Sequence, residues 1–180
     1  VSNLWVRTEN GSMPPNGTLS TEDINLIAEW IDEGATETVQ NPIGSNVFIT
    51  ELTDPQNSSD AGRYVELHNS GDSDIDLSTW QLQRWTNGNA DPSSPVSLIG
   101  TISAGGFYII CNDADKFSTI YSLTCDQDIG TGGPADSNGD DNIALIDGDG
   151  VIVDMFGVAG EDGSGTGHEF EDGRAERAAI

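Results

Sequence analysis

The sequence has few basic residues. Of its 180 residues, 6 are Lys or Arg and 31 are Asp or Glu, so the formal net charge is −25. Nucleic acid binding depends on basic side chains that displace counterions from phosphates, and anionic membrane surfaces attract the same side chains. The composition therefore argues against nucleic acid as a partner and leaves cations, basic proteins and neutral polymers. Dense carboxylates also keep a secreted protein in solution, which is the simplest reason for this composition.

Long hydrophobic runs are also missing. No stretch approaches the roughly 20 apolar residues that a membrane-spanning helix needs, so no membrane insertion is expected. No signal peptide is found and the first residue is Val1, which predicts an excised piece of a longer precursor. The 35% hydrophobic content is enough for one modest core with an appendage.

Cysteine is scarce. Cys111 and Cys125 are the two cysteines of the sequence, and their spacing matches no zinc-binding pattern. Outside the cell such a pair usually forms a disulfide, which would stabilise the fold by about 3 kcal/mol on the chain-entropy model. We therefore predict a Cys111–Cys125 disulfide and an extracellular, cell-surface or periplasmic location. Two buried thiols are the alternative.

The residues that catalysis needs are not arranged for it. No Gly-x-Ser-x-Gly sequence precedes a helix, and His68 and His168 lie in a predicted strand and a Gly-rich tail. Glu51 and Glu66 lie within predicted strands, where a pair of carboxylates could in principle hydrolyse a glycoside. No catalytic constellation is visible in the sequence, so we predict that no enzyme activity is present.

A charge inside a strand is usually paired or at an edge. The two glutamates could share a partner such as Arg63 or Arg84, or they could bind a cation. Among the tryptophans, Trp30 and Trp80 are predicted to lie in a core. Trp85, at a strand end, is the better candidate for an exposed carbohydrate platform.

One segment has helical periodicity. Ser20 is a suitable N-cap and Asp23 occupies the capping-box position. The apolar residues that repeat at helical spacing are Ile24, Ile27, Ala28 and Ile31. Gly34 is expected to end the helix. A polar stretch at 39–46 reads as a linker, so residues 1–38 are predicted to be a loop and helix that precede a domain at 47–180.

The pattern beyond residue 46 is extended. Seven short segments rich in β-branched and aromatic residues are predicted strands: 47–52, 63–69, 80–85, 96–102, 107–111, 143–147 and 151–156. An Asp-Gly turn joins the last two into a hairpin, and a short helix is expected at 114–121. This succession predicts an all-β protein with an antiparallel sandwich or barrel.

The order of these motifs resembles the bacterial lamin-tail domain. The resemblance is carried by VFITEL (47–52), GRYVELHNSGDSDIDLSTWQL (62–82), ISAGGFYIIC (102–111) and GDDNIALIDGDGVIVDMFGVAGED (139–162). It implies an immunoglobulin-like β-sandwich over 47–180, with the loop and helix as an N-terminal appendage. Glu51 and Glu66 belong to the family's pattern, which implies that they are structural and not a catalytic pair. It also implies a non-catalytic accessory module of a secreted or surface-attached bacterial protein, used for adhesion, spacing or targeting. Its partner would be a protein or a polysaccharide.

The first residues resemble the C-terminal end of a class I cytochrome c. Met13-Pro14-Pro15 and the sequence Trp-Ile-Asp-Glu-Gly-Ala at 30–35 carry this likeness. Met13 would then be a haem axial ligand in an intact parent domain, but the Cys-x-x-Cys-His attachment site is absent and would lie upstream of Val1. The alternative function is thus part of an electron-transfer protein with haem c in the parent and no cofactor in this chain. A helix without its haem domain is predicted to promote self-association.

One acidic segment offers ligands for a cation. The sequence DSNGDDN at 136–142 places oxygens at Asp136, Asn138, Asp140 and Asp141, and calcium prefers six to eight hard oxygens. We predict a possible calcium site there. The alternative is that these residues form turns through hydrogen bonds to their own backbone.

Overall fold

The structure, a computed structural model, describes residues 19–32, 45–55 and 62–178. The chain divides into two compact units, Val1–Gln40 and Asn41–Ile180. Within the described ranges, no helix combines the length and the apolar character that crossing a membrane requires.

The described part of the first unit is helix α2 (Thr21–Asp32). Its first turn is closed by the capping box that the sequence predicts. The Asp23 N–H donates to Ser20 Oγ at 3.1 Å, and the Ser20 N–H donates back to Asp23 Oδ2 at 3.3 Å. Two otherwise unpaired donors are thereby satisfied at the helix start. Met13 and Gly34 lie outside the described residues.

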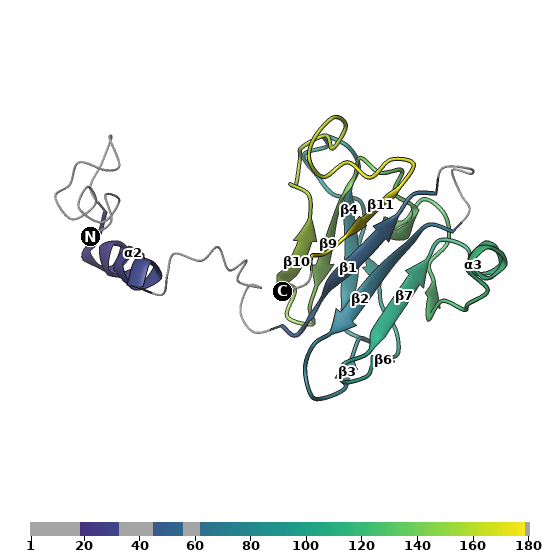
Figure 1. The fold of residues 1–180 in the computed structure, drawn as a ribbon, viewed down its shortest axis with the longest axis horizontal. Helices are drawn as coiled ribbons and strands as arrows, with labels where there is room; N and C mark the ends of the chain where they lie inside the picture. The colour runs from purple at the N-terminus through teal and green to yellow at the C-terminus, as the bar shows by residue number, and fades with distance from the viewer. Residues whose placement is uncertain (1–18, 33–44, 56–61, 179–180) are drawn as a thin grey trace. The chain divides into compact units, whose positions relative to one another are not determined.

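The second unit is a β-sandwich (Figure 1). Its five-stranded sheet has the order β11-β1-β2-β7-β8 and consists of β1 (Val47–Thr53), β2 (Tyr64–Asn69), β7 (Phe107–Cys111), β8 (Gln127–Asp128) and β11 (Arg174–Glu176). The four-stranded sheet has the order β10-β9-β4-β5 and consists of β4 (Gln81–Trp85), β5 (Val96–Ser97), β9 (Asn142–Ile146) and β10 (Ile152–Phe156). The remaining elements are the pair β3 (Ile75–Asp76) and β6 (Thr101–Ile102), helix α3 (Ala114–Tyr121) and the 3-10 turn η1 (Pro134–Asp136).

Strand alternation places the core between the two sheets. In β2, Val65 and Leu67 are buried. The alternate residues Tyr64, Glu66 and His68 are half-buried and lie on the opposite face. All five residues of β9 are buried, as befits a central strand. The sheet interiors meet through apolar side chains that include Leu67, Leu82, Ile110, Ile143 and Leu145, each worth roughly 1.5–3 kcal/mol on burial. The all-β sandwich prediction is confirmed.

The predicted strand at 96–102 is wrong in one respect. The structure divides it into β5, which pairs with β4, and β6, which pairs with β3. Gly100 lies between them with φ +75, a conformation that favours glycine. The Tyr108 hydroxyl donates to the Ile99 carbonyl at 2.6 Å and holds this turn. The chain therefore crosses between sheets within a segment whose composition is uniformly strand-like.

Three strands, β3, β8 and β11, were not predicted from the sequence. β8 pairs with β7 in parallel, whereas the other pairings of the described strands are antiparallel. β11 comes from the Gly-rich tail and pairs with β1, with Leu52 opposite Ala175. Phe170, shortly before β11, is 4% exposed and belongs to the core. The tail is thus part of the sandwich.

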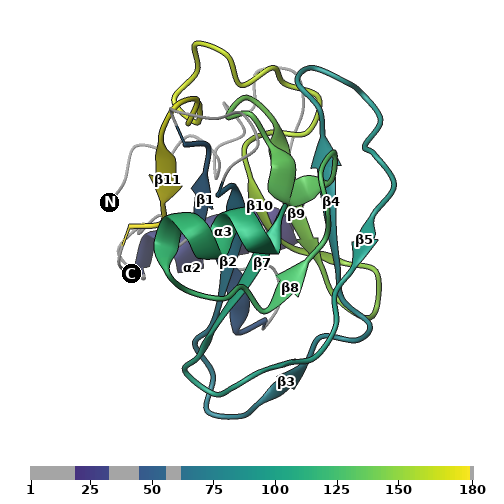
Figure 2. The same ribbon diagram turned by 90° about the vertical axis from the view of Figure 1, so that its right-hand side faces the viewer.

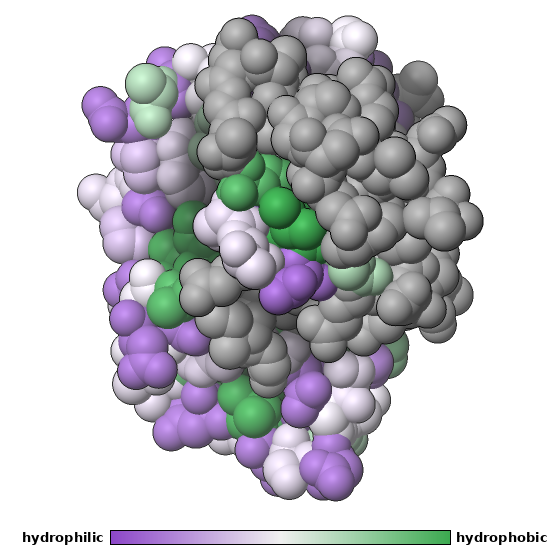
Figure 3. All heavy atoms as spheres, turned by 90° about the vertical axis from the view of Figure 1, so that its left-hand side faces the viewer, coloured by the Kyte–Doolittle hydropathy of each residue, from purple (hydrophilic) through white to green (hydrophobic). Residues whose placement is uncertain are grey.

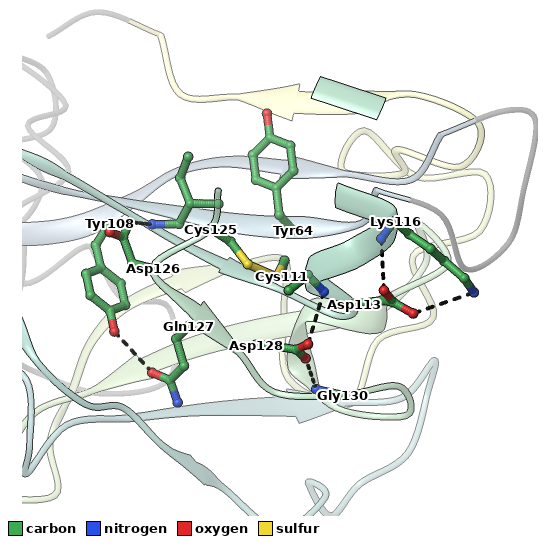
Figure 4. The surroundings of a disulfide bond; sticks show 12 residues. Tyr64, Tyr108, Cys111, Asp113, Lys116, Cys125, Asp126, Gln127, Asp128 and Gly130 are labelled. Carbon is green, nitrogen blue, oxygen red and sulfur yellow. Dashed lines mark hydrogen bonds and ion pairs between the residues drawn. A yellow bond between two sulfur atoms is a disulfide. The ribbon is translucent and has the colours of Figure 1, made fainter. Parts of the chain in front are cut away.

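Helix α3 lies across the outer face of the five-stranded sheet, over β2 and β7 (Figure 2). The Lys116 N–H donates to the Asp113 carboxylate at 2.9 Å, which caps the helix as predicted for 114–121. Phe117 is 1% exposed and packs edge-on against Tyr64. The predicted disulfide is present: Cys111 at the end of β7 is bonded to Cys125 beyond α3 (Figure 4). It ties both ends of the α3 segment to the sheet.

Candidate ligand-binding groove

A groove enclosing about 580 Å³ lies on the outer face of the five-stranded sheet. We call it the aromatic groove; it is lined by Phe48, Thr50, His68, Ser70, Phe107, Arg177 and Ala178. Helix α3 covers Tyr64 at one end of β2, and the groove includes His68 near the other end. The same sheet face is therefore closed at one end and accessible at the other.

The aromatic residues come together because three strands are in register. Phe48 of β1 lies opposite His68 of β2, and His68 lies opposite Phe107 of β7. The His68 ring stacks on Phe107 at 4.6 Å between centroids, and Phe48 meets His68 edge-on at 5.5 Å. Contacts of this kind stabilise a cross-strand pair by roughly 0.5–1.5 kcal/mol beyond the buried area. Phe107 remains 58% exposed, so one flat ring is held in place and accessible.

Arg177 forms the polar side of the groove. Its guanidinium lies 5.3 Å from the centroid of the Phe48 ring. Nε donates to the Ile49 carbonyl at 2.7 Å, and Nη2 donates to both oxygens of Asp154 at 2.8 and 2.6 Å. Within the described part of the chain, Nη1 of Arg177 and the two ring nitrogens of His68 make no hydrogen bond. These donors and acceptors are available to a ligand.

Two hydroxyl groups complete the lining. Thr50 Oγ1 donates to the Glu66 carboxylate at 2.7 Å, and Ser70 Oγ donates to the Asn46 carbonyl at 3.1 Å. A hydroxyl that donates its proton can still accept a hydrogen bond. The groove therefore combines a flat apolar surface with several polar atoms at its border, which is the usual composition of a small-ligand site.

In the view of Figure 3, hydrophobic residues (green) are visible at several places among hydrophilic ones (purple). Scattered patches are normal on a globular surface and carry no functional meaning by themselves. The aromatic groove differs from such patches because its rings are fixed by stacking and flanked by an arginine.

Glu51 and Glu66 are neighbours across β1 and β2. Burial raises the pKa of Glu51; its hydrogen bond with Tyr64 and the charge of Arg174 oppose the shift, and the Glu66 carboxylate adds to it. The ion-pair partner of Glu51 is Arg174, at 3.4 Å. The pairing of the glutamates with Arg63 or Arg84 is wrong, because both arginines form ion pairs with aspartates instead.

Arg63, just before β2, is buried between two carboxylates. Its Nε is 2.7 Å from Asp54 Oδ1 and its Nη1 is 3.1 Å from Asp136 Oδ1. Arg84 forms an ion pair with Asp141 at 3.3 Å and donates to the carbonyl of Asp136 at 3.0 Å. The two arginines therefore neutralise much of the acidic segment and join it to β2 and β4.

The candidate calcium ligands lie in this region. Asp136 accepts from Arg63 and from the Gly132 N–H, and Asp141 accepts from the Asn87 N–H at 3.0 Å. The side chains of the four residues differ in setting: Asn138 is exposed, and Asp140 Oδ1 is a buried oxygen without a hydrogen-bond partner among the described residues.

Calcium prefers six to eight hard oxygen ligands. Across the described ranges, no three side chains of His, Cys, Asp or Glu cluster in a way that could hold a metal. The calcium site at 136–141 stays a prediction, which a calcium titration would test.

Trp85 is not the exposed platform that the sequence suggested. It is 7% exposed and therefore buried. Trp80 packs against the core, as predicted. The accessible aromatic ring belongs instead to Phe107 of β7, whose strand is predictable from the sequence but whose exposure is not.

Two sheets with largely antiparallel strands around a single core define an immunoglobulin-like β-sandwich. Residues 40–160, most of the chain, match the family model described as Lamin Tail Domain, and the chain belongs to this family. No curated protein matches the chain. The family match begins at residue 40 and so lends no support to the cytochrome c resemblance of the first residues, which stays a prediction.

Proposed function

We propose that this lamin tail domain is a non-catalytic interaction module of a secreted or surface-attached bacterial protein, and that it binds through the aromatic groove. The observation that supports the proposal is the exposed ring of Phe107, held by His68 beside Arg177. A module that served only as a spacer would have no use for a fixed, accessible ring. The groove therefore favours adhesion or targeting over spacing.

The chemistry of the histidines supports a non-catalytic role. The His68 ring stacks on Phe107, and His168 lies 3.0 Å from the Thr166 hydroxyl and edge-on to Phe156. Both rings thus serve packing. The fold itself does not decide the question, because function resides in sites rather than in folds.

The disulfide supports a location outside the cytoplasm. Disulfides persist in oxidising compartments and are rare where thiols are kept reduced. The Cys111–Cys125 bond and the net charge of −25 therefore fit an extracellular, cell-surface or periplasmic protein.

The experiment is a comparison of two surface variants in a binding panel. Purified full chain is incubated with insoluble polysaccharides and with immobilised basic proteins, and the bound fraction is measured by co-sedimentation. Phe107→Ser should reduce binding to the true partner, whereas Leu123→Ser should not. Leu123 is a matched control because it is 59% exposed, close to the 58% of Phe107, and lies outside the groove. Binding that is equal in both variants for every panel member would contradict the proposal.

The alternative function, part of a c-type cytochrome in an electron-transfer protein, rests on the sequence of residues 12–35 alone. It requires a Cys-x-x-Cys-His motif upstream of Val1. Reading the gene there would decide it.

A further inference from the structure

We propose that the aromatic groove binds a neutral polysaccharide, with one sugar ring stacked on the face of Phe107 that His68 leaves free and with hydroxyl groups of the saccharide chain hydrogen-bonded to Arg177 and His68. The inference rests on the proposed function, because it assumes that the groove is the binding site. It adds the chemical class of the ligand.

The shape of the groove fits a sugar ring. A pyranose has a face of C–H groups that packs on a flat aromatic ring, and Phe107 offers such a ring at 58% exposure. The ring is held by the stacked imidazole of His68, so little side-chain freedom is lost when a ligand binds. The groove volume of about 580 Å³ lies within the usual range of small-ligand sites, about 300–1,000 Å³.

The polar atoms distinguish a sugar from an apolar peptide side chain. Among the described residues, Nη1 of Arg177 and the ring nitrogens of His68 have no protein partner. An aliphatic or aromatic side chain that filled the groove would remove these atoms from water without replacing the lost hydrogen bonds, which is unfavourable. Sugar hydroxyls both donate and accept, so they satisfy the arginine N–H and either nitrogen of the imidazole.

The charges of the groove favour a ligand without net charge. Arg177 is the fixed cation of the lining, and Asp154 already neutralises it, because both carboxylate oxygens accept from Nη2. The nearby Glu66 carboxylate is held by Thr50. An anionic polymer would also approach a chain of net charge −25, which repels it at low ionic strength.

The test uses the full chain and soluble probes: cellohexaose, xylohexaose, mannohexaose and, as the anionic counterpart, an oligogalacturonate. Binding is measured by titration calorimetry and by shifts in the NMR spectrum. At least one neutral probe should bind, and Phe107→Ala should raise its Kd about tenfold or more, which corresponds to about 1.4 kcal/mol. Leu123→Ala should leave the Kd unchanged. Circular dichroism of each variant shows that the fold is retained.

A second variant tests the polar contacts. His68→Phe keeps an aromatic ring on Phe107 and removes the ring nitrogens. This variant should bind the neutral saccharide with a Kd several times higher than that of the wild type. A purely apolar ligand would bind the variant and the wild type equally tightly.

The outcomes separate the inference from the proposed function. If the saccharides fail to bind, or the anionic one binds tighter, while a protein of the panel binds in a Phe107-dependent way, the saccharide inference is wrong and the interaction module stands. If neither saccharides nor proteins depend on Phe107, both are wrong. Saccharide binding that Phe107→Ala leaves intact would also overturn the inference.

Discussion

Asp154 of β10 and Arg177 just beyond β11 join the two sheets of the sandwich. The Asp154 carboxylate accepts from Arg177 Nη2 at 2.8 and 2.6 Å and also from the Ile49 N–H at 2.7 Å. Arg177 Nε in turn donates to the Ile49 carbonyl at 2.7 Å. The β1–β11 pairing covers Glu51 to Thr53, and β1 has a register shift after Ile49. Side chains therefore satisfy backbone groups at the point where the strand ladder is interrupted.

Substitution of Asp154 should destabilise the fold. Asp154→Ala leaves the Arg177 guanidinium and the buried Ile49 N–H without their partner, and we expect the free energy of unfolding to fall by about 2–4 kcal/mol. Urea denaturation should show a lower midpoint with an unchanged m-value. Glu176→Ala is the control, because its ion pair with Arg174 has side chains 55% and 61% exposed and should be worth about 0–1 kcal/mol. Equal effects of both substitutions would refute the structural role of Asp154.

Truncation at the end of the family match should prevent stable folding. A chain that ends at residue 160 lacks β11 and the core residue Phe170, and it exposes the edge of β1. Loss of a buried Phe costs about 3–5 kcal/mol, and a free edge strand promotes aggregation. Size-exclusion chromatography should show aggregates for residues 41–160 and a discrete species for residues 41–178. A folded, soluble 41–160 fragment would contradict this assignment.

The pH dependence of stability should carry a contribution from Asp141. Burial raises the pKa of Asp141 above its ordinary 3.8, although Arg84 and the Asn87 N–H oppose the shift. Around and above pH 3.8 the folded state therefore binds more protons than the unfolded state. The contribution of this group to the free energy of unfolding then falls as pH rises from about 3.8 through the raised pKa. Asp141→Asn removes the titration, and its stability relative to wild type should improve as pH rises from about 4.

Asp76 provides a control of opposite sign. Hydrogen bonds from Ser78 lower the pKa of Asp76, an exposed residue. Its contribution to stability is present at neutral pH and is lost on acidification. The stability of Asp76→Asn relative to wild type should therefore fall as pH rises. Denaturation midpoints measured from pH 3 to 7 for both variants should diverge; parallel curves would exclude a raised pKa at Asp141.

Reduction of the disulfide should weaken the sandwich. The bond closes a loop with a sequence separation of 14, and its loss should lower the free energy of unfolding by about 3 kcal/mol on the chain-entropy model. The melting temperature should therefore fall in the presence of a reductant. Mass spectrometry of the untreated chain should show the mass of two missing hydrogens. Rapid thiol labelling without reductant would disprove the bond.

Residues 1–38 are expected to promote self-association. The apolar stripe of the predicted helix includes Ile24 and Ile27, and apolar surface of this kind favours contact with another surface. Salt shortens the Debye length to a few Å at high concentration, so repulsion between acidic copies should weaken. Sedimentation should show association that increases with salt, and deletion of residues 1–38 should leave a monomer. A full chain that stays monomeric at high salt would contradict the prediction.

The strands with clear alternation were predictable, because each carries its own periodic signal. β11 could not be predicted: its three residues, Arg-Ala-Glu, have no strand pattern and pair with β1 only through the folded context. The split between β5 and β6 likewise depends on which sheet each half joins.

The aromatic groove could not be predicted from the sequence, for a related reason. Phe48, His68 and Phe107 occupy outward positions that alternation could identify. Their contact depends on the register of β1, β2 and β7, which are far apart in the sequence. The same holds for Arg63 and Asp136, which are 73 positions apart, whereas the disulfide was predictable because two cysteines allow one pairing.

The antiparallel pairing of β1 and β11 also determines how the domain responds to tension. Glu51 lies opposite Glu176 and Thr53 opposite Arg174, so the chain enters β1 and leaves β11 at the same end of the pair. A pulling force applied through residues 47 and 177 would load the hydrogen bonds between these strands one after another instead of shearing them together. Arg177, Asp154 and Ile49 would bear the load first, and β11 would then peel from the sheet. Anchored by both ends, the sandwich should therefore yield and extend at low force.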